Sequence, residues 1–257
     1  MLRRAAPASV LLLAGCATPL PERAMRCGEA RPPAFAAPDR ERIATILSVL
    51  TYNIEGLGWP ARSGRAASLH KIGERLAAMR QAGRAPDIIL FQEMFSGAAK
   101  QAVAAAGYPA IVTGPRRTTR AQGATRDALP GHSNIRRGEI GLHLTGSGLA
   151  IASRYSIRMV DMHAYGRRSC AGIDCLANKG ALVARLAVPG MAQPVHVVNT
   201  HLNARKAAGV PIARSQRAFE RQVDLLTRFV RAQVPEDAPL ILGGDMNIGR
   251  DPARQRA

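Results

Sequence analysis

Polar side chains that suit metal and phosphate chemistry follow several apolar runs of this sequence. They are Asn53, Glu93, His201, Asn203, Asp245 and Asn247. Carboxylates and amides are ligands for hard divalent cations, and an imidazole can donate a hydrogen bond to an oxyanion. Because the set contains no Cys, it favours Mg²⁺ or Mn²⁺ over a softer metal.

The stretch 239–247 shows the pattern most clearly. Three apolar residues and two glycines lead to Asp245 and Asn247, which stand two positions apart. The apolar run predicts a strand buried on both faces. Because residues two apart in a strand point to the same side, a carboxylate and an amide are expected side by side. Taken alone, the stretch is also typical of an ordinary Gly-Asp turn.

Strands and helices must alternate to position these residues. The hydrophobic pattern predicts strands over residues 46–53, 86–93, 179–188 and 194–203, and helices over residues 68–81, 98–106 and 213–233. Residues 148–154 and 157–162 are expected to form two strands that pair with each other, and residues 113–147 to form loops around a cleft. Ligands of open α/β sheets bind at strand ends, where these polar residues would meet.

Five short motifs, in order, resemble those of the endonuclease/exonuclease/phosphatase superfamily. They are Thr-Tyr-Asn-Ile, Gln-Glu, Gly-Leu-Ala-Ile-Ala-Ser-Arg, Asn-Thr-His-Leu and Gly-Asp-Met-Asn, and the resemblance runs from about residue 47 to residue 247. The resemblance implies an α/β fold, a four-layer α/β sandwich of two packed mixed sheets flanked by helices. It also implies Mg²⁺-dependent hydrolysis of a phosphodiester or phosphomonoester.

The same resemblance implies roles for individual residues. Glu93 is implied as the principal metal ligand, and Asn53 as a residue that assists at the metal or the phosphate. His201 is implied as a donor to a phosphate oxygen. Asp245 and Asn247 are implied to orient the attacking water and the phosphoryl group. In-line displacement at phosphorus depends on positioning and on charge neutralisation, which this set supplies.

Residues 174–180 resemble one branch of the superfamily more than the others. In neutral and bacterial sphingomyelinases, an Asp and a Lys five positions later approach one another near the active site. The resemblance implies that Lys179, held by Asp174, neutralises charge that develops on the phosphate. The alternative is a solvated loop with a chance ion pair. Asn203 is assigned to substrate binding.

The start of the chain predicts export. Two Arg residues precede an apolar stretch over residues 5–14, which is typical of a signal peptide and too short to span a bilayer. Leu-Ala-Gly-Cys16 resembles the bacterial lipobox, which implies cleavage before Cys16 and diacylglycerol attachment to its sulfur. An ordinary buried Cys is the alternative. Ala17 follows the Cys and favours the outer over the inner membrane.

These features predict three parts of the chain. Residues 1–15 are expected to be a lipoprotein signal peptide, and residues 16–42 a lipidated Cys followed by a Pro/Ala-rich tether. Residues 43–257 are expected to form one domain, long enough for a sizeable core. The protein is therefore expected at the bacterial cell envelope, attached to the membrane through lipid.

Charge and cysteine content narrow the partners and the compartment. The formal net charge of +18 favours phospholipid headgroups, nucleic acid or other polyanions, although Arg-rich composition also arises from GC-rich coding. Cys170 and Cys175 are close enough in sequence to close a short loop in a compartment that permits disulfides, which would leave Cys27 unpaired.

The chain departs from the family pattern near its end. That pattern closes with a further strand and an Asp-His pair, whose His is the general base. No His follows His201 here, and Asp251 is not followed by one. A general base contributes about 10²–10⁴-fold in rate. We expect the final strand to be missing and the chain as written to be severely impaired, either as an incomplete gene product or as a degenerate protein.

The expected function is hydrolysis of a phospholipid headgroup by a sphingomyelinase-like, metal-dependent phosphodiesterase that acts as a monomer. A nuclease of the same superfamily is an alternative, motivated by the Arg excess. A non-catalytic envelope lipoprotein is another, motivated by the missing His.

Overall fold

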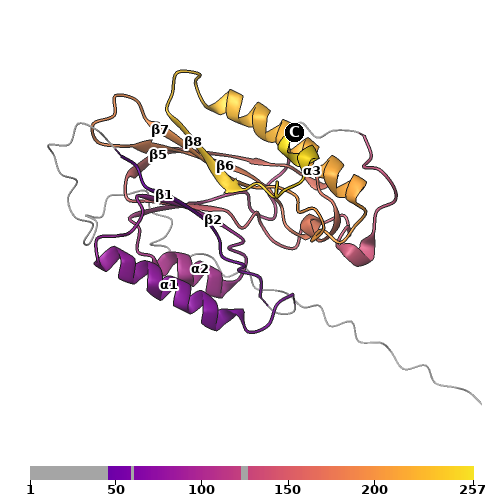
Figure 1. Cartoon of the computed structure of the whole chain (residues 1–257), viewed down its shortest axis with the longest axis horizontal. Helices are drawn as coiled ribbons and strands as arrows, with labels where there is room; N and C mark the ends of the chain where they lie inside the picture. The colour runs from indigo at the N-terminus through magenta and orange to yellow at the C-terminus, as the bar shows by residue number, and fades with distance from the viewer. Residues whose placement is uncertain (1–45, 59–60, 123–126) are drawn as a thin grey trace, which may run out of the picture.

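Two four-stranded β-sheets pack face to face, with helices on both outer faces (Figure 1). This computed structural model describes residues 46–58, 61–122 and 127–257, so the predicted signal peptide, the lipidated Cys16 and the tether lie outside the described residues. The predicted four-layer α/β sandwich is confirmed. Every helix in the described part of the chain is too short or too polar to cross a membrane.

The first sheet has the strand order β1-β2-β4-β3. Its elements are β1 (Val49–Asn53), β2 (Ile88–Gln92), β3 (Ala110–Thr113) and β4 (Ala150–Ser153), with α1 (Arg65–Gln81) and α2 (Gly97–Ala105) on its outer face. Strands β1 and β2 are parallel, whereas β4 runs antiparallel to both neighbours. Leu69 of α1 and Val103 of α2 pack against Ile89 and Phe91, which fixes the helical layer on β2.

The second sheet has the strand order β5-β6-β7-β8. Its elements are β5 (Ser156–Ala164), β6 (Gly180–Ala187), β7 (Val195–His201) and β8 (Leu240–Asp245), and α3 (Ile212–Gln233) covers it. Strands β7 and β8 are parallel. Phe219 and Leu226 of α3 pack over Val183 and Val198, so the apolar side of this helix covers the middle of the sheet.

Short helical segments connect these layers near the ends of the strands. They are η2 (Ile135–Arg137), η3 (Arg167–Ser169), η4 (Gly172–Leu176) and α4 (Pro252–Gln255). Apart from η2, residues 114–149 contain no helix or strand in their described part, as expected for loops.

A polar pair interrupts the aliphatic interior between the sheets. Asn199 of β7 is fully buried, and its amide oxygen accepts a hydrogen bond of 2.8 Å from the side chain of Gln92 in β2. Its amide nitrogen donates to the carbonyls of Phe91 and Ala150, at 2.9 Å each. These buried groups form all their hydrogen bonds in only one arrangement of the sheets. They therefore fix the position of one sheet against the other.

The expected pairing of residues 148–154 with residues 157–162 is wrong. Strand β4 pairs with β2 and β3, whereas β5 pairs with β6 in the opposite sheet. The chain turns between the sheets at Arg154, whose backbone N–H donates to the carbonyl of Asp87 at 3.0 Å. The Arg154 guanidinium also pairs with the Asp87 carboxylate at 2.6 Å. This contact anchors the turn from one sheet to the other. The short gap between the two predicted strands does not by itself show that they belong to different sheets.

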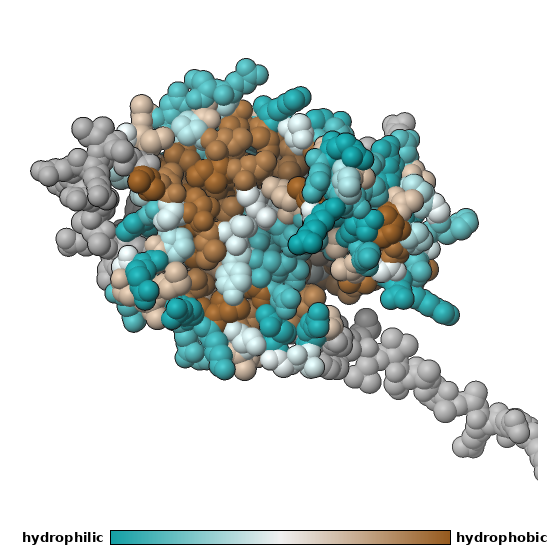
Figure 2. Space-filling model, viewed as in Figure 1, coloured by the Kyte–Doolittle hydropathy of each residue, from teal (hydrophilic) through white to brown (hydrophobic). Residues whose placement is uncertain are grey.

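The expectation that β8 is buried on both faces is also wrong. Leu240 and Leu242 are 43% and 47% exposed. Strand β8 is an edge strand, and α3 packs mainly over β6 and β7. Within the described ranges no strand pairs with the outer edge of β1 or β8, and Figure 2 shows hydrophobic surface there. The expected absence of a final strand stays a prediction.

The Asp87 contacts predict a pH-dependent contribution to stability. Burial alone would raise the pKa of Asp87, but hydrogen bonds from Ser48 and Arg154 outweigh it and lower the pKa. A carboxyl whose pKa is lower in the folded state stabilises the protein above its unfolded-state pKa, and this contribution is lost as pH falls through the folded-state value. We expect Asp87→Asn to lower the free energy of unfolding by about 1.5–3 kcal/mol at neutral pH.

Urea unfolding across a pH series measures this effect, and the difference from the parent should shrink below about pH 4. Asp224→Asn is the control, because Asp224 lies in an exposed ion pair on α3 and should change stability by less than about 0.5 kcal/mol. A loss in Asp87→Asn that is independent of pH would contradict the assignment.

Candidate active site

The ends of both parallel strand pairs meet at one rim of the sandwich. The Asn53 side chain at the end of β1 donates to the carboxylate of Glu93, just after β2, at 2.9 Å. The same amide nitrogen donates to Asp245 at the end of β8, also at 2.9 Å, across 192 positions of sequence. His201 at the end of β7 lies with Nε2 3.6 Å from the Asp245 carboxylate. The structure thus brings together four of the predicted residues.

The backbone at this rim is unusual. In the described part of the chain, the non-glycine residues with positive φ are Glu55, Glu93 and Asn247, at 47°, 60° and 49°. Such conformations are uncommon for residues with a Cβ and cluster at functional sites. At Glu93 this bend turns the chain away from β2 directly after the buried strand.

The Glu93 carboxyl is held where ionisation is unfavourable. Burial is the main reason why the pKa of Glu93 lies above its usual value. The hydrogen bond from Asn53 opposes this rise, and the nearby charge of Asp245 adds to it. Two carboxylates therefore share one neutral amide donor, and the site carries excess negative charge.

His201 is buried and uncharged at neutral pH. Burial, with a smaller effect of the Lys179 charge, holds the pKa of His201 well below its usual value. Its Nδ1 atom has no hydrogen-bond partner among the residues that the structure describes. A neutral imidazole offers one donor and one acceptor, so this ring can give a single hydrogen bond to a phosphate oxygen.

The predicted Asp174–Lys179 pair is formed, and it is buried. The Lys179 ammonium lies 2.7 Å from one carboxylate oxygen of Asp174 and donates to the Leu202 carbonyl at 2.9 Å. The other carboxylate oxygen accepts the backbone N–H of Ala204 at 2.6 Å. These contacts rule out a solvated loop with a chance ion pair. They also place a fixed positive charge near Glu93. This charge opposes, but does not cancel, the rise that burial causes in the pKa of Glu93.

A disulfide closes the loop that carries Asp174. Cys170 and Cys175 are bonded, with 2.03 Å between the sulfur atoms. The expected short disulfide loop is confirmed, and Cys27 lies outside the described residues. Asp174 stands in η4, directly before Cys175, so the crosslink constrains the segment that holds the Lys179 counter-ion.

The side chain of Asn203, which is predicted to bind substrate, contacts the backbone. Its side chain is fully buried, its amide oxygen accepts the N–H of Ala171 at 2.9 Å, and its amide nitrogen donates to the Ala204 carbonyl at 2.8 Å. Both amide groups therefore hydrogen-bond to the backbone and hold the loop, and the assignment to substrate binding stays a prediction. Asn247 lies at the rim, where its amide donates to the Leu202 carbonyl at 2.8 Å.

Sequence reasoning missed Arg254, which orders the loops behind the rim. This residue of α4 is buried and donates to the carbonyls of Asn203 and Asn247 at 2.8 Å each. Its guanidinium carbon lies 4.3 Å from the centre of the Phe219 ring in α3. No local sequence feature distinguishes Arg254 from the exposed Arg residues near it in the chain. Its burial depends on contacts that only the folded chain provides.

The donors at the rim fit a hard divalent cation. The described residues hold no group of three or more His, Cys, Asp and Glu side chains suited to a metal. A set of two carboxylates and one amide, from Glu93, Asp245 and Asn53, is typical of Mg²⁺, which keeps several waters and needs few protein ligands. The negative charge of the two carboxylates would attract such a cation.

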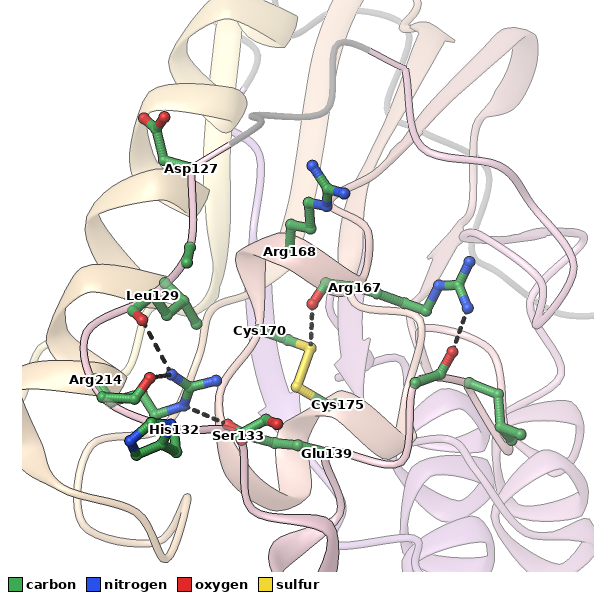
Figure 3. A pocket seen from close by; sticks show the side chains of 14 residues that line it. Asp127, Leu129, His132, Ser133, Glu139, Arg167, Arg168, Cys170, Cys175 and Arg214 are labelled. Carbon is green, nitrogen blue, oxygen red and sulfur yellow. Dashed lines mark hydrogen bonds and ion pairs between the residues drawn. A yellow bond between two sulfur atoms is a disulfide. The ribbon is translucent and has the colours of Figure 1, made fainter.

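Two cavities lie near these loops, and they differ in character. One, of about 710 Å³, is lined by Asp245, Asn247, Asp251, Arg205, Lys206 and Arg250. Arg205 pairs with Asp251 at 2.7 Å, and Lys206 and Arg250 add further positive charge. The other, of about 540 Å³, lies beside the disulfide (Figure 3), and none of the rim residues lines it.

The buried pair generates a prediction on stability. Asp174→Asn leaves Lys179 buried without its counter-ion, and we expect the free energy of unfolding to fall by about 3–5 kcal/mol at neutral pH. The double variant Asp174→Asn/Lys179→Met should lose clearly less than the two single variants together, because it removes both charges. Urea unfolding of the four proteins measures this coupling.

The exposed pair Asp224 and Arg228 on α3 is the matched control, with an expected coupling below about 0.5 kcal/mol. Single effects that simply add at Asp174 and Lys179 would show that the two charges do not depend on each other.

Solved structures with similar folds include two from bacteria. A beta toxin variant from Staphylococcus aureus with bound magnesium ions superposes with a TM-score of 0.60 at 21% identity, over 82% of this chain and 68% of that one. Sphingomyelinase C from Streptomyces griseocarneus gives 0.57 at 24% identity, over 81% and 67%. A humanized D. rerio TDP2 gives 0.51 at 17% identity, over 82% and 65%. At these identities the likeness establishes the fold.

A comparison with curated protein sequences gives no match. The family model described as Endonuclease/Exonuclease/phosphatase family matches residues 50–256, which is most of the chain. With its two-sheet sandwich and the acidic rim at the strand ends, the chain belongs to the endonuclease/exonuclease/phosphatase family, a superfamily of phosphodiesterases and nucleases.

Proposed function

We propose that this protein is a Mg²⁺-dependent phosphodiesterase that acts on a phospholipid headgroup. The observation that carries the proposal is the pair of hydrogen bonds by which Asn53 joins Glu93 and Asp245 across the two sheets. This junction lies beside the buried Lys179 ammonium, so a site for a cation and a fixed positive charge are close together. Phosphoryl transfer needs both features.

Each rim residue has a proposed task. Glu93 and Asn53 would hold Mg²⁺, which when bound polarises the phosphoryl oxygens. Neutral His201 donates a hydrogen bond to a phosphate oxygen, and Lys179 supplies positive charge that Asp174 keeps in place. Asp245 is held between Asn53 and the backbone N–H of Asn247, and orients the attacking water.

We assign no general base among the residues of the rim. The proposed division of labour therefore rests on positioning and on charge. Positioning and charge stabilisation can each raise the rate of phosphoryl transfer without a general base.

Support for a lipid substrate comes from several sides. The likeness to Sphingomyelinase C and to beta toxin concerns the fold, and the buried Asp174–Lys179 pair agrees with the segment expected from the sphingomyelinase branch. The predicted lipid anchor at Cys16 would hold the domain at a membrane. A nuclease is the second candidate, favoured by Arg205, Lys206 and Arg250 along the cavity at the rim.

The test is metal-dependent release of phosphocholine from sphingomyelin vesicles by the full chain. We expect slow release with Mg²⁺, because the rim has no assigned general base, and none with EDTA. Glu93→Gln should lower the rate by about 10²–10³-fold, because it removes the charge of the proposed metal ligand. Glu74→Gln is the control, because Glu74 is an exposed residue of α1 and its loss should leave the rate unchanged.

Nicking of supercoiled plasmid under the same conditions separates the second candidate. Nicking without phosphocholine release would identify a nuclease. Inactivity toward both substrates, or a Glu93→Gln variant as active as the parent, would count against a phosphodiesterase.

A further inference from the structure

An exposed group of aliphatic side chains lies on two segments near the disulfide. Its members, defined here as the aliphatic patch, are Ile135, Ile140, Leu142, Leu144 and Ile173, which are 70%, 38%, 49%, 58% and 49% exposed. Five large aliphatic side chains on two neighbouring segments are more than the scattered apolar residues of an ordinary surface. Such patches mark interaction sites.

The two segments that carry the patch are tied together. The backbone N–H of Leu144 donates to the carbonyl of Leu176 in η4 at 2.7 Å. The ring of His143 forms a hydrogen bond of 2.9 Å with the Cys175 carbonyl. Gly138 lies so close to η4 that a Cβ there would stand 2.9 Å from the Cα of Ile173. Residues 135–144 and η4 therefore form one surface.

A buried ion pair fixes this surface from beneath. The Glu139 carboxylate accepts the Arg214 guanidinium at 2.8 Å and the backbone N–H of Gly172 at 2.9 Å. Figure 3 shows Arg214 of α3 pointing toward Glu139 beside the disulfide. The aliphatic side chains are thus exposed on a segment that is anchored to α3 and η4. A loose loop could turn them inward, but this one cannot without breaking the buried pair.

The surroundings of the patch are positively charged. Arg136, Arg137, Arg167 and Lys206 are exposed on or next to the two segments. The acids of these segments are Glu139 and Asp174, and both are paired with cations on the inner side. The outer face therefore combines aliphatic side chains with unbalanced positive charge.

We propose that the aliphatic patch docks the domain on the surface of an anionic phospholipid bilayer. Aliphatic side chains gain free energy at the boundary between headgroups and acyl chains, and Arg and Lys bind the phosphates around them. Nucleic acid fits this surface less well, because the patch has no aromatic side chain on which bases could stack. The charge complementarity selects an anionic lipid surface over a zwitterionic one.

Docking through this surface would bring the active site to the headgroups. Ile173 of the patch and Asp174 of the buried pair are adjacent in η4, one facing water and the other facing Lys179. The inference rests on the proposed function in so far as docking serves hydrolysis of a lipid. The binding itself can be measured without any turnover.

The test compares variants of the full chain that carry Cys16→Ser, which removes the predicted site of lipid attachment. Ile135→Ser/Leu142→Ser/Leu144→Ser should bind vesicles of phosphatidylglycerol and phosphatidylcholine at least about tenfold more weakly than its parent in co-sedimentation, because three aliphatic side chains no longer enter the interface. Arg136→Glu/Arg137→Glu should also weaken binding, and more so at low salt.

Leu240→Ser/Leu242→Ser is the matched control, because these leucines of β8 are similarly exposed on a different surface. Its binding should stay within about twofold of the parent, since these side chains lie outside the proposed interface. Unchanged binding of the triple variant, or an equal loss in the control, would overturn the proposal. Equal binding of the parent to pure phosphatidylcholine vesicles would overturn the assignment to an anionic surface.

Hydrolysis of a soluble phosphodiester, bis(4-nitrophenyl) phosphate, separates docking from chemistry. The triple variant should keep the parent's rate on this substrate and lose activity only on vesicles. If the parent hydrolyses neither substrate, the proposed function fails, while the vesicle-binding comparison still decides the docking proposal. A triple variant that loses both activities equally would show damage to the site, and would contradict a role confined to docking.

Discussion

The amide of Asn199 lies between the two sheets, out of contact with water, and makes hydrogen bonds to the side chain of Gln92 and to two backbone carbonyls of the opposite sheet. A buried amide without partners costs about 1–3 kcal/mol, so a shifted register would be penalised at several groups at once. Gln92 directly precedes Glu93, and Asn199 stands two positions before His201. The constraint that aligns the sheets therefore also aligns the residues of the rim.

The rim is a place where like charges are forced together. Glu93 and Asp245 come from different sheets and share the amide of Asn53, while burial and mutual repulsion make ionisation of Glu93 less favourable. Such repulsion destabilises the fold unless another interaction offsets it. A divalent cation bound to the same oxygens would relieve the repulsion and act as a Lewis acid toward a phosphoryl oxygen.

Behind the rim, the Leu202 carbonyl accepts hydrogen bonds from both Lys179 and Asn247. Arg254 holds the neighbouring carbonyls of Asn203 and Asn247, and stacks on Phe219 of α3. Two buried cations thus organise the loops that follow β7 and β8. Lys179 faces the Asp174 carboxylate and the Leu202 carbonyl, whereas Arg254 faces backbone carbonyls.

The sequence by itself determined most of the elements, though not β3, and the polar residues at the strand ends, because hydrophobic period and strand-end position are local properties. Asn53, Glu93, His201 and Asp245 could be chosen in this way. The pairing of Asp174 with Lys179 was implied by the resemblance to sphingomyelinases. Only the tertiary structure placed β4 and β5 in different sheets, left Leu240 exposed at an edge, and turned the Asn203 amide toward the backbone. Those outcomes, like the burial of Arg254, depend on partners far along the chain, and a local pattern of residue types does not specify which distant groups will satisfy a buried hydrogen bond or cover an apolar face.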